Sequence, residues 1–282
     1  MSGVPTTRSE LDGKGNRDRS AADPVAGLNT REYPTEESAA LAETFLARLG
    51  EAEGFHVPRV RRREGRRLVV ESLPGKALTS PDRDIMLTVA NLQARIHVLD
   101  WPGYESREAC AENYRRFFRE RLATYEHLGL VSDSLRKRLV RRFETAIPWR
   151  MHPAVIHDDL WGGSVLYHEG DIYLADYASV KFLALESDLL NSARYFRTQF
   201  ERLTGGLYSL RTRYVRAYCD HGARMCEVVQ EIDANRPFFV AFNALRKGCD
   251  VLLRLHAEGE DRGEGLAFAM RRLRHIRSAL KV

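Results

Sequence analysis

Apolar residues recur at three- and four-residue spacing through most of the chain, which is the pattern of amphipathic helices. The first such stripe follows the helix-start signal Thr35-Glu36-Glu37 and predicts a helix over residues 36–49. The same spacing predicts a helix that ends near Pro102-Gly103, and two more over residues 107–128 and 132–146. From Glu186 to the C-terminus the helical pattern returns.

Short β-branched or aromatic runs interrupt the helices at two places. Residues 56–60 and 67–71 are predicted strands on either side of a turn at Glu64-Gly65. The second group comprises residues 155–156, 165–167 and 172–174. A small α/β part thus precedes a larger helical part, which indicates an α+β protein. Leu73-Pro74-Gly75 breaks the pattern between them, so we expect an N-terminal lobe over 28–75 and a helical lobe over 76–282.

Composition and charge narrow the possible partners. Lys and Arg outnumber Asp and Glu by 44 to 39, and the net charge of +5 suits an anionic ligand such as a nucleotide. It is too small to indicate nucleic acid binding. No apolar run could span a membrane and no signal peptide is recognisable, so we expect a cytoplasmic protein without a membrane partner. The four cysteines lack metal-ligand spacing, which is typical of reduced thiols.

The densest charge run is the basic patch from Arg59 to Arg67. A solvated hairpin turn is the favoured interpretation. The alternative is a docking surface for an acidic protein or peptide partner.

Two acidic residues, Asp159 and Asp176, follow two short apolar runs and are separated by a predicted hairpin. This arrangement favours phosphoryl transfer, because one carboxylate can accept the proton of an attacking hydroxyl while the other holds magnesium against a triphosphate.

Several motifs carry a resemblance to a known family. The segments are His157-Asp158-Asp159-Leu160-Trp161-Gly162-Gly163-Ser164-Val165-Leu166, Leu174-Ala175-Asp176-Tyr177, Asp188-Leu189, Ala94-Arg95-Ile96-His97 and Leu73-Pro74-Gly75-Lys76-Ala77-Leu78. Together they resemble the aminoglycoside phosphotransferase and choline kinase-like family. The resemblance implies a bilobal protein kinase-like fold, with a small N-terminal sheet lobe and a larger helical lobe carrying a catalytic loop at 157–166 and a metal-binding loop at 174–177. Residues 1–27 are either a poorly ordered segment or an eroded glycine-rich hairpin.

The resemblance also implies roles for the acidic residues. Asp159 is the expected catalytic base, and Asp176 is the expected Mg²⁺ ligand. His157 is expected to pin the loop through side-chain hydrogen bonds. The second metal ligand falls at Ser164, where the family usually has Asn.

The nucleotide site is implied in the same way. Arg31 stands where the family has its phosphate-binding lysine, and Glu43 matches the acid that pairs with that lysine. Backbone groups of Glu71, Ser72 and Leu73 are expected to line the adenine.

The predicted function is therefore an ATP-dependent phosphotransferase, or kinase, acting on a hydroxyl of a small molecule. Amino sugars, aminoglycoside-like antibiotics, amino alcohols and natural-product peptides are the candidate acceptors, and the acids Glu186, Asp188 and Asp220 are candidates for attracting a cationic one. The alternative is a catalytically inactive kinase-fold protein, a pseudokinase, that binds a peptide or protein.

Overall fold

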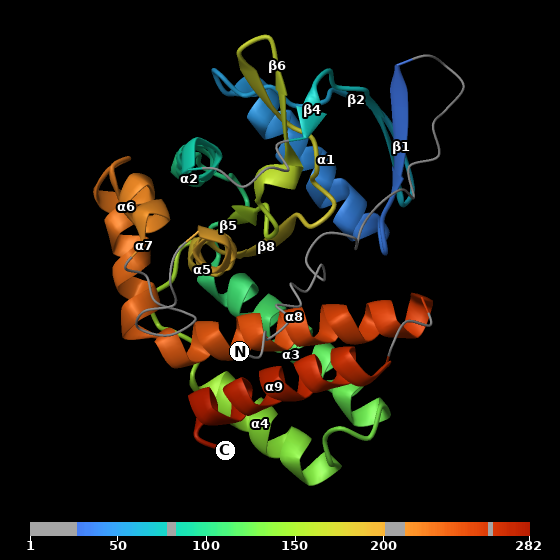
Figure 1. Ribbon diagram of the computed structural model, residues 1–282, viewed down its shortest axis with the longest axis vertical. Coiled ribbons are helices and arrows are strands. Elements are labelled where there is room, and N and C mark those ends of the chain that lie inside the picture. Colours follow the sequence, from blue (N-terminus) through green and yellow to red (C-terminus); the bar gives the residue numbers. More distant parts are fainter. Residues whose placement is uncertain (1–26, 78–82, 201–211, 259–261) are drawn as a thin grey trace, which may run out of the picture.

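The computed structural model describes residues 27–77, 83–200, 212–258 and 262–282. Gly27 apart, the expected N-terminal segment lies outside these residues. Figure 1 shows a sheet-containing part at the top and a helical part below it. The strands form three small sheets with the orders β1-β3-β2, β4-β6-β7 and β5-β8. Their bounds are β1 Leu28–Glu32, β2 Val60–Glu64, β3 Arg67–Glu71, β4 Lys76–Ala77, β5 Pro153–Ile156, β6 Val165–His168, β7 Asp171–Leu174 and β8 Lys181–Ala184.

The first sheet differs from the sequence prediction at one strand. Residues 56–60 were expected to pair with residues 67–71, but β2 begins only at Val60 and runs through the arginines to Glu64. The two-residue turn after Glu64 sets this register, because Gly65 has φ 56° and two-residue hairpins favour positive φ. His56 instead forms an isolated bridge with Tyr173.

Four of the six arginines in the basic patch form ion pairs with acids of the same lobe. Arg61 binds Glu71, and Arg62 lies 2.9 Å from Glu64. Arg63 and Arg66 pair with Glu43 and Glu32, and these exposed pairs neutralise much of the patch. Docking of an acidic partner there stays a prediction.

The predicted helices are present, with ends that follow capping residues. Thr35 forms a capping box with Ser38, and Ser106 and Ser132 accept N-cap hydrogen bonds. The helices are α1 Glu36–Glu51, α2 Arg83–Val98, α3 Arg107–His127, α4 Asp133–Thr145, α5 Leu185–Phe200, α6 Arg213–Cys219, α7 Ala223–Ala234, α8 Arg236–Glu258 and α9 Arg262–Leu280.

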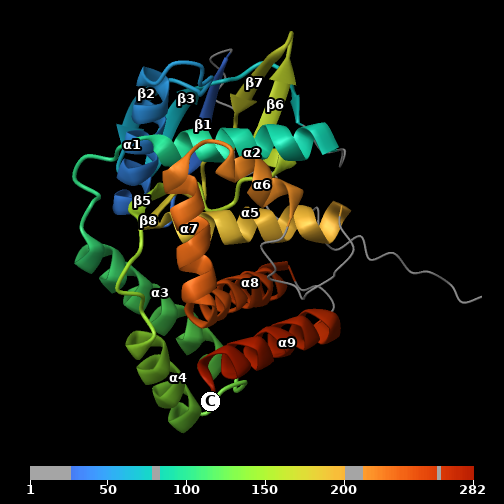
Figure 2. The same ribbon diagram turned by 90° about the vertical axis from the view of Figure 1, so that its left-hand side faces the viewer.

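The helices pack in layers beneath the sheets. Figure 2 shows α2, α5, α8 and α9 one below another, and α5 packs on both α2 and α8. Aromatic rings join α3, α4 and α8 in the core, where Phe118 stacks on Phe143 at 3.8 Å and Phe143 stacks on Phe238 at 4.7 Å between ring centroids. No described helix has the length and apolar content needed to cross a bilayer.

The β6–β7 hairpin brings the two acidic loops together. Its turn residues Glu169 and Gly170 both have positive φ, at 51° and 99°, which matches the twist of a two-residue hairpin. One loop runs from β5 into the short 3₁₀ turn Gly162–Ser164, and the other runs from β7 to β8. Asp159 and Asp176 therefore lie at the same end of this hairpin.

Candidate active site

The loop after β5 carries Asp159 and has an unusual residue before it. Asp158 adopts φ 65°, a left-handed conformation that glycine adopts more readily than other residues. Two bonds from α5 hold it: the Asp158 N–H donates to Asp188 Oδ1 at 2.8 Å, and Asn191 donates to the Asp158 carbonyl at 2.8 Å. Asp188 and Asn191 are both buried, so α5 fixes the position of this loop.

The Asp158 side chain is also buried, and two cations neutralise it. Arg246 Nη1 of α8 lies 2.6 Å from Asp158 Oδ2, and Lys181 of β8 binds the same carboxylate. A buried charge needs such partners because its desolvation is costly. Burial lowers the pKa of Arg246, but the combined attraction of Asp158, Asp250 and Asp159 outweighs burial, and the pKa is raised.

Asp159 points to a more open environment. Its side chain is 41% exposed, and Oδ1 lies 3.2 Å from Lys247 Nζ, whose side chain is 30% exposed. Burial favours a higher pKa for Asp159, but the charges of Lys247 and Arg246 outweigh this effect and lower it. Conversely, burial and Arg246 lower the pKa of Lys247. Asp159 is therefore ionised at neutral pH.

His157 ties the two acidic loops to each other. Its Nε2–H donates to the carbonyl oxygen of Asp176, and its Nδ1 accepts the N–H of Asp159 at 3.4 Å. The side chain is buried, as expected for the loop-pinning residue.

Asp176 is bound by Arg31 from the N-terminal sheet. Arg31 Nη1 donates to Asp176 Oδ1 at 2.8 Å, and the guanidinium lies 4.9 Å from the ring centre of Tyr177. Burial lowers the pKa of Arg31, but Asp176 together with Tyr177 and Tyr33 more than offsets burial, and the pKa is raised. Oδ1 also accepts the N–H of Ala178 at 3.2 Å. Among the described residues Oδ2 has no partner, so one oxygen of Asp176 is available to a metal ion.

Ser164 is less suited to hold metal. Its side chain is buried, and Oγ donates to the carbonyl of Asp159 at 2.9 Å. Its own carbonyl accepts the N–H of Ala175 at 2.9 Å. The Ser164 hydroxyl and carbonyl thus both form hydrogen bonds within the two loops. Within the described residues, no group of three or more His, Cys, Asp or Glu side chains gathers around a metal-sized site.

Glu43 does not pair with Arg31 in this structure. Glu43 accepts from Arg63 Nε at 2.7 Å, while Arg31 turns to Asp176. The expected pairing is therefore wrong, because β2 places an arginine opposite the outer face of α1 and satisfies the glutamate there. Its nucleotide-binding role stays a prediction.

The segment expected to line adenine leaves β3. The N–H of Glu71 donates to the Arg59 carbonyl at 3.0 Å, and that of Ser72 donates to the Gly27 carbonyl at 2.8 Å. The N–H of Leu73 has no partner among the described residues. Leu73 is therefore the residue of this segment best able to donate to a nucleobase.

Sequence patterns did not predict the cations that surround Asp158 and Asp159. Arg246 and Lys247 are consecutive in α8, and they bind the consecutive residues Asp158 and Asp159. The sequence did contain one sign of a buried charge. Arg246 follows Leu245 directly and lies about one helical turn before Cys249, and both of these apolar neighbours are buried. A charged residue on such a stripe indicates a buried partner.

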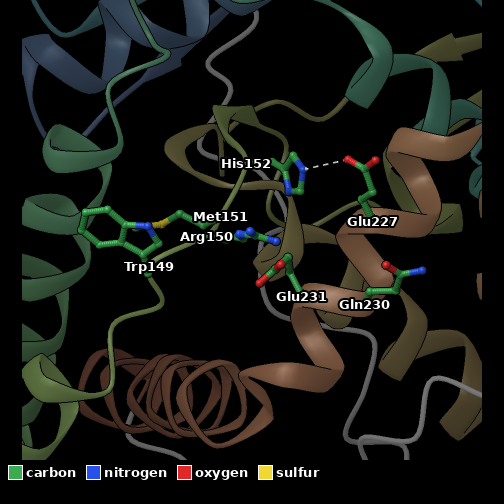
Figure 3. A pocket seen from close by; sticks show the side chains of 7 residues that line it. All are labelled: Trp149, Arg150, Met151, His152, Glu227, Gln230 and Glu231. Atoms are coloured by element: carbon green, nitrogen blue, oxygen red, sulfur yellow. Dashed lines mark ion pairs between the residues drawn. The ribbon is translucent and has the colours of Figure 1, made fainter.

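A separate pocket of about 530 Å³ lies at the other end of β5 (Figure 3). It is lined by Trp149, Arg150, Met151, His152, Glu227, Gln230 and Glu231. His152 Nδ1 lies 2.8 Å from Oε1 of the buried Glu186. This hydrogen bond raises the pKa of His152.

The His152–Glu186 pair should make stability depend on pH. The pKa of His152 is raised in the folded state, so protonation stabilises the fold below the unfolded pKa, and this contribution is lost as pH rises through the folded pKa. Urea unfolding at several pH values should show wild type losing its advantage over His152→Gln as pH rises. A pH-independent difference would contradict the assignment, and His127→Gln serves as a control at an exposed helix end.

Comparison with solved structures shows which folds this chain resembles. The fold resembles an ethanolamine kinase of Plasmodium vivax with TM-score 0.62 and 13% identity, covering 90% of this chain and 76% of that one. It resembles choline kinase LicA of Streptococcus pneumoniae with TM-score 0.59 and 11% identity over 90% and 87% of the two chains. It also resembles the ADP-bound aminoglycoside phosphotransferase APH(2'')-Ib with TM-score 0.57 and 10% identity over 90% and 88%.

These likenesses establish the bilobal protein kinase-like fold predicted from the motifs. A search of curated proteins found no match. Residues 28–228 match the phosphotransferase enzyme family. This range contains both acidic loops and the N-terminal sheet. The chain belongs to the phosphotransferase enzyme family.

Proposed function

We propose that this protein is an ATP-dependent phosphotransferase that moves the γ-phosphate to a hydroxyl of a small molecule. The observation that carries the proposal is the His157 link, which holds the Asp159 loop and the Asp176 loop together. Two carboxylates at adjacent loop ends, one beside a cation and one with an available oxygen, supply the two functions that phosphoryl transfer requires.

Asp159 would act as the base. It is ionised and partly exposed, so it can accept a hydrogen bond from an acceptor hydroxyl and then its proton. The loop around it is fixed by Asp188, Asn191 and Ser164. Such fixation supports catalysis because positioning contributes much of the rate in phosphoryl transfer.

Asp176 and Arg31 would bind the phosphate end of ATP. Mg²⁺, when bound, neutralises charge on the phosphates, and Oδ2 of Asp176 would be its protein ligand. Arg31 would donate to phosphate oxygens with the nitrogens that do not face Asp176. The N–H of Leu73 would donate to the adenine. The four cysteines are free thiols, which supports the reducing cytoplasm as the location.

Arg31→Met should weaken Mg-ATP binding by about tenfold or more, because a charge-assisted bond to phosphate is lost. Arg66→Met is the matched control, since Arg66 lies in the same lobe and forms an exposed ion pair with Glu32. Calorimetric titration with ATP measures both. Equal affinities for wild type and Arg31→Met would remove Arg31 from the site.

The proposed function is tested by the same titration of the wild-type protein, with and without magnesium, followed by assay of ADP release with hydroxyl acceptors. Magnesium-dependent binding is the expected result. A folded protein that gives no heat with millimolar ATP would contradict the proposal and favour the binding of a peptide or protein partner.

A further inference from the structure

Lys247 lies where an acceptor would have to bind. Its Nζ is 3.2 Å from Asp159 Oδ1, and both side chains are partly exposed. A hydroxyl that donates to Asp159 would therefore lie within a few ångströms of the ammonium group, since each hydrogen bond is roughly 3 Å long. Any anionic group near that hydroxyl would be within reach of Lys247.

The charges behind this pair leave an excess of positive charge. Arg246, Lys247 and Lys181 surround Asp158 and Asp159, so three cations face two carboxylates. Asp250 also attracts Arg246 and Lys247, but Arg121 pairs with it at 3.3 Å, so one positive charge remains in the group. Arg246 is buried, and its Nε and Nη2 find no hydrogen-bond partner among the described residues. Lys247 forms its only ion pair within the described residues with Asp159. The local field therefore favours an anion.

The acids expected to attract a cationic acceptor lie elsewhere. Glu186 is buried and binds His152, and Asp188 is buried between His97 and the Asp158 N–H. Asp220 is exposed at the C-cap of α6. None of these three forms an ion pair with Lys247 or contacts Asp159, so none of them is placed to bind a cationic acceptor beside the base.

We propose that the acceptor is a small hydroxyl compound with a carboxylate or phosphate close to the hydroxyl, and that Lys247 binds this anionic group. The inference rests on the phosphotransferase function proposed above. When the acceptor binds, Lys247 Nζ leaves Asp159 and forms an ion pair with the anionic group of the acceptor. Asp159 can then accept a proton. The hydroxyl oxygen then forms the bond to the γ-phosphorus, its proton passes to Asp159, and the bond to ADP breaks.

The test compares acceptors that differ in one group. Each set has an anionic, a neutral and an amine member. The first set is glycerate, glycerol and aminopropanediol, and the second is gluconate, glucose and glucosamine. Glycerol 3-phosphate shows whether phosphate is preferred to carboxylate. ADP release with Mg-ATP gives kcat/KM for each, and wild type should prefer the anionic member by about 10- to 100-fold. Lys247→Met should reduce that ratio to about one, and Lys247→Glu should shift the preference to the amine. Lys137→Met is the control, because Lys137 is exposed in α4 and pairs with Asp133.

The other outcomes each decide the question. A wild-type preference for neutral or amine acceptors would overturn the inference but leave the phosphotransferase standing. An equal loss for every acceptor in Lys247→Met would place Lys247 at the transferred phosphate and also overturn it. Magnesium-dependent ATP binding without turnover of any anionic compound contradicts the acceptor class. Absence of both ATP binding and turnover overturns the proposed function itself.

Discussion

Replacing Asp159 by asparagine should lower kcat by a factor of about 10²–10⁴, the usual contribution of a positioned general base. The amide keeps the size of the side chain but cannot take the hydroxyl proton. Affinity for Mg-ATP should change little, because Asp159 contacts Lys247 and not the Arg31–Asp176 pair. Single-turnover ADP formation and calorimetry separate the two effects.

A control for this variant is Asp171→Asn. Asp171 is the exposed first residue of β7, at the turn end of the hairpin and thus at the opposite end from Asp159. It should retain wild-type turnover. If Asp159→Asn kept full turnover, the base would have to be another group and the site assignment would be wrong. If it lost ATP binding as well, Asp159 would be required for the nucleotide site.

Arg246→Met should destabilise the fold by about 3–5 kcal/mol, the usual cost of breaking a buried ion pair from one side. The methionine leaves the Asp158 carboxylate in the interior with Lys181 as its remaining cation and without the guanidinium that lies 2.6 Å away in wild type. Equilibrium urea unfolding followed by circular dichroism measures this loss. Lys137→Met removes an exposed pair instead and should have little effect.

A double variant shows whether the cost comes from the uncompensated charge. In Asp158→Gly/Arg246→Met both charged groups are removed, and glycine suits the φ of 65° at this position. Its loss of stability should be clearly smaller than the sum of the two single losses. An additive result would mean that Arg246 stabilises the fold through packing alone.

Local patterns predicted most of the helices and the strands that flank the loops of Asp159 and Asp176. The Thr35 signal gave the start of α1, and the runs beside Asp159 and Asp176 became β5, β6 and β7. These features depend on neighbours in the chain, namely capping groups, turn residues and apolar spacing. The resemblance then supplied the fold, because the order of the motifs follows the order of the loops.

Side-chain pairing over long distances could not be predicted in the same way. The family resemblance pairs Glu43 with Arg31, but in the structure Glu43 pairs with Arg63. This happens because β2 begins four residues later than its apolar pattern suggests and brings Arg63 to α1. Lys247 and Asp159 lie in separate parts of the chain, and only the packing of α8 under the catalytic loop brings them together. Charge alone does not indicate which of the 44 basic residues will occupy such a place.

The left-handed Asp158 also has a consequence for the order in which the protein matures during synthesis. Its counter-charge at Arg246 is translated long after the loop itself and lies beyond residue 228, where the family match ends. A nascent chain that stops short of α8 carries both catalytic-loop acids without Arg246 and Lys247. The charges of this loop are therefore balanced late, when α8 packs against it, and translation products that end before α8 lack these two ion pairs.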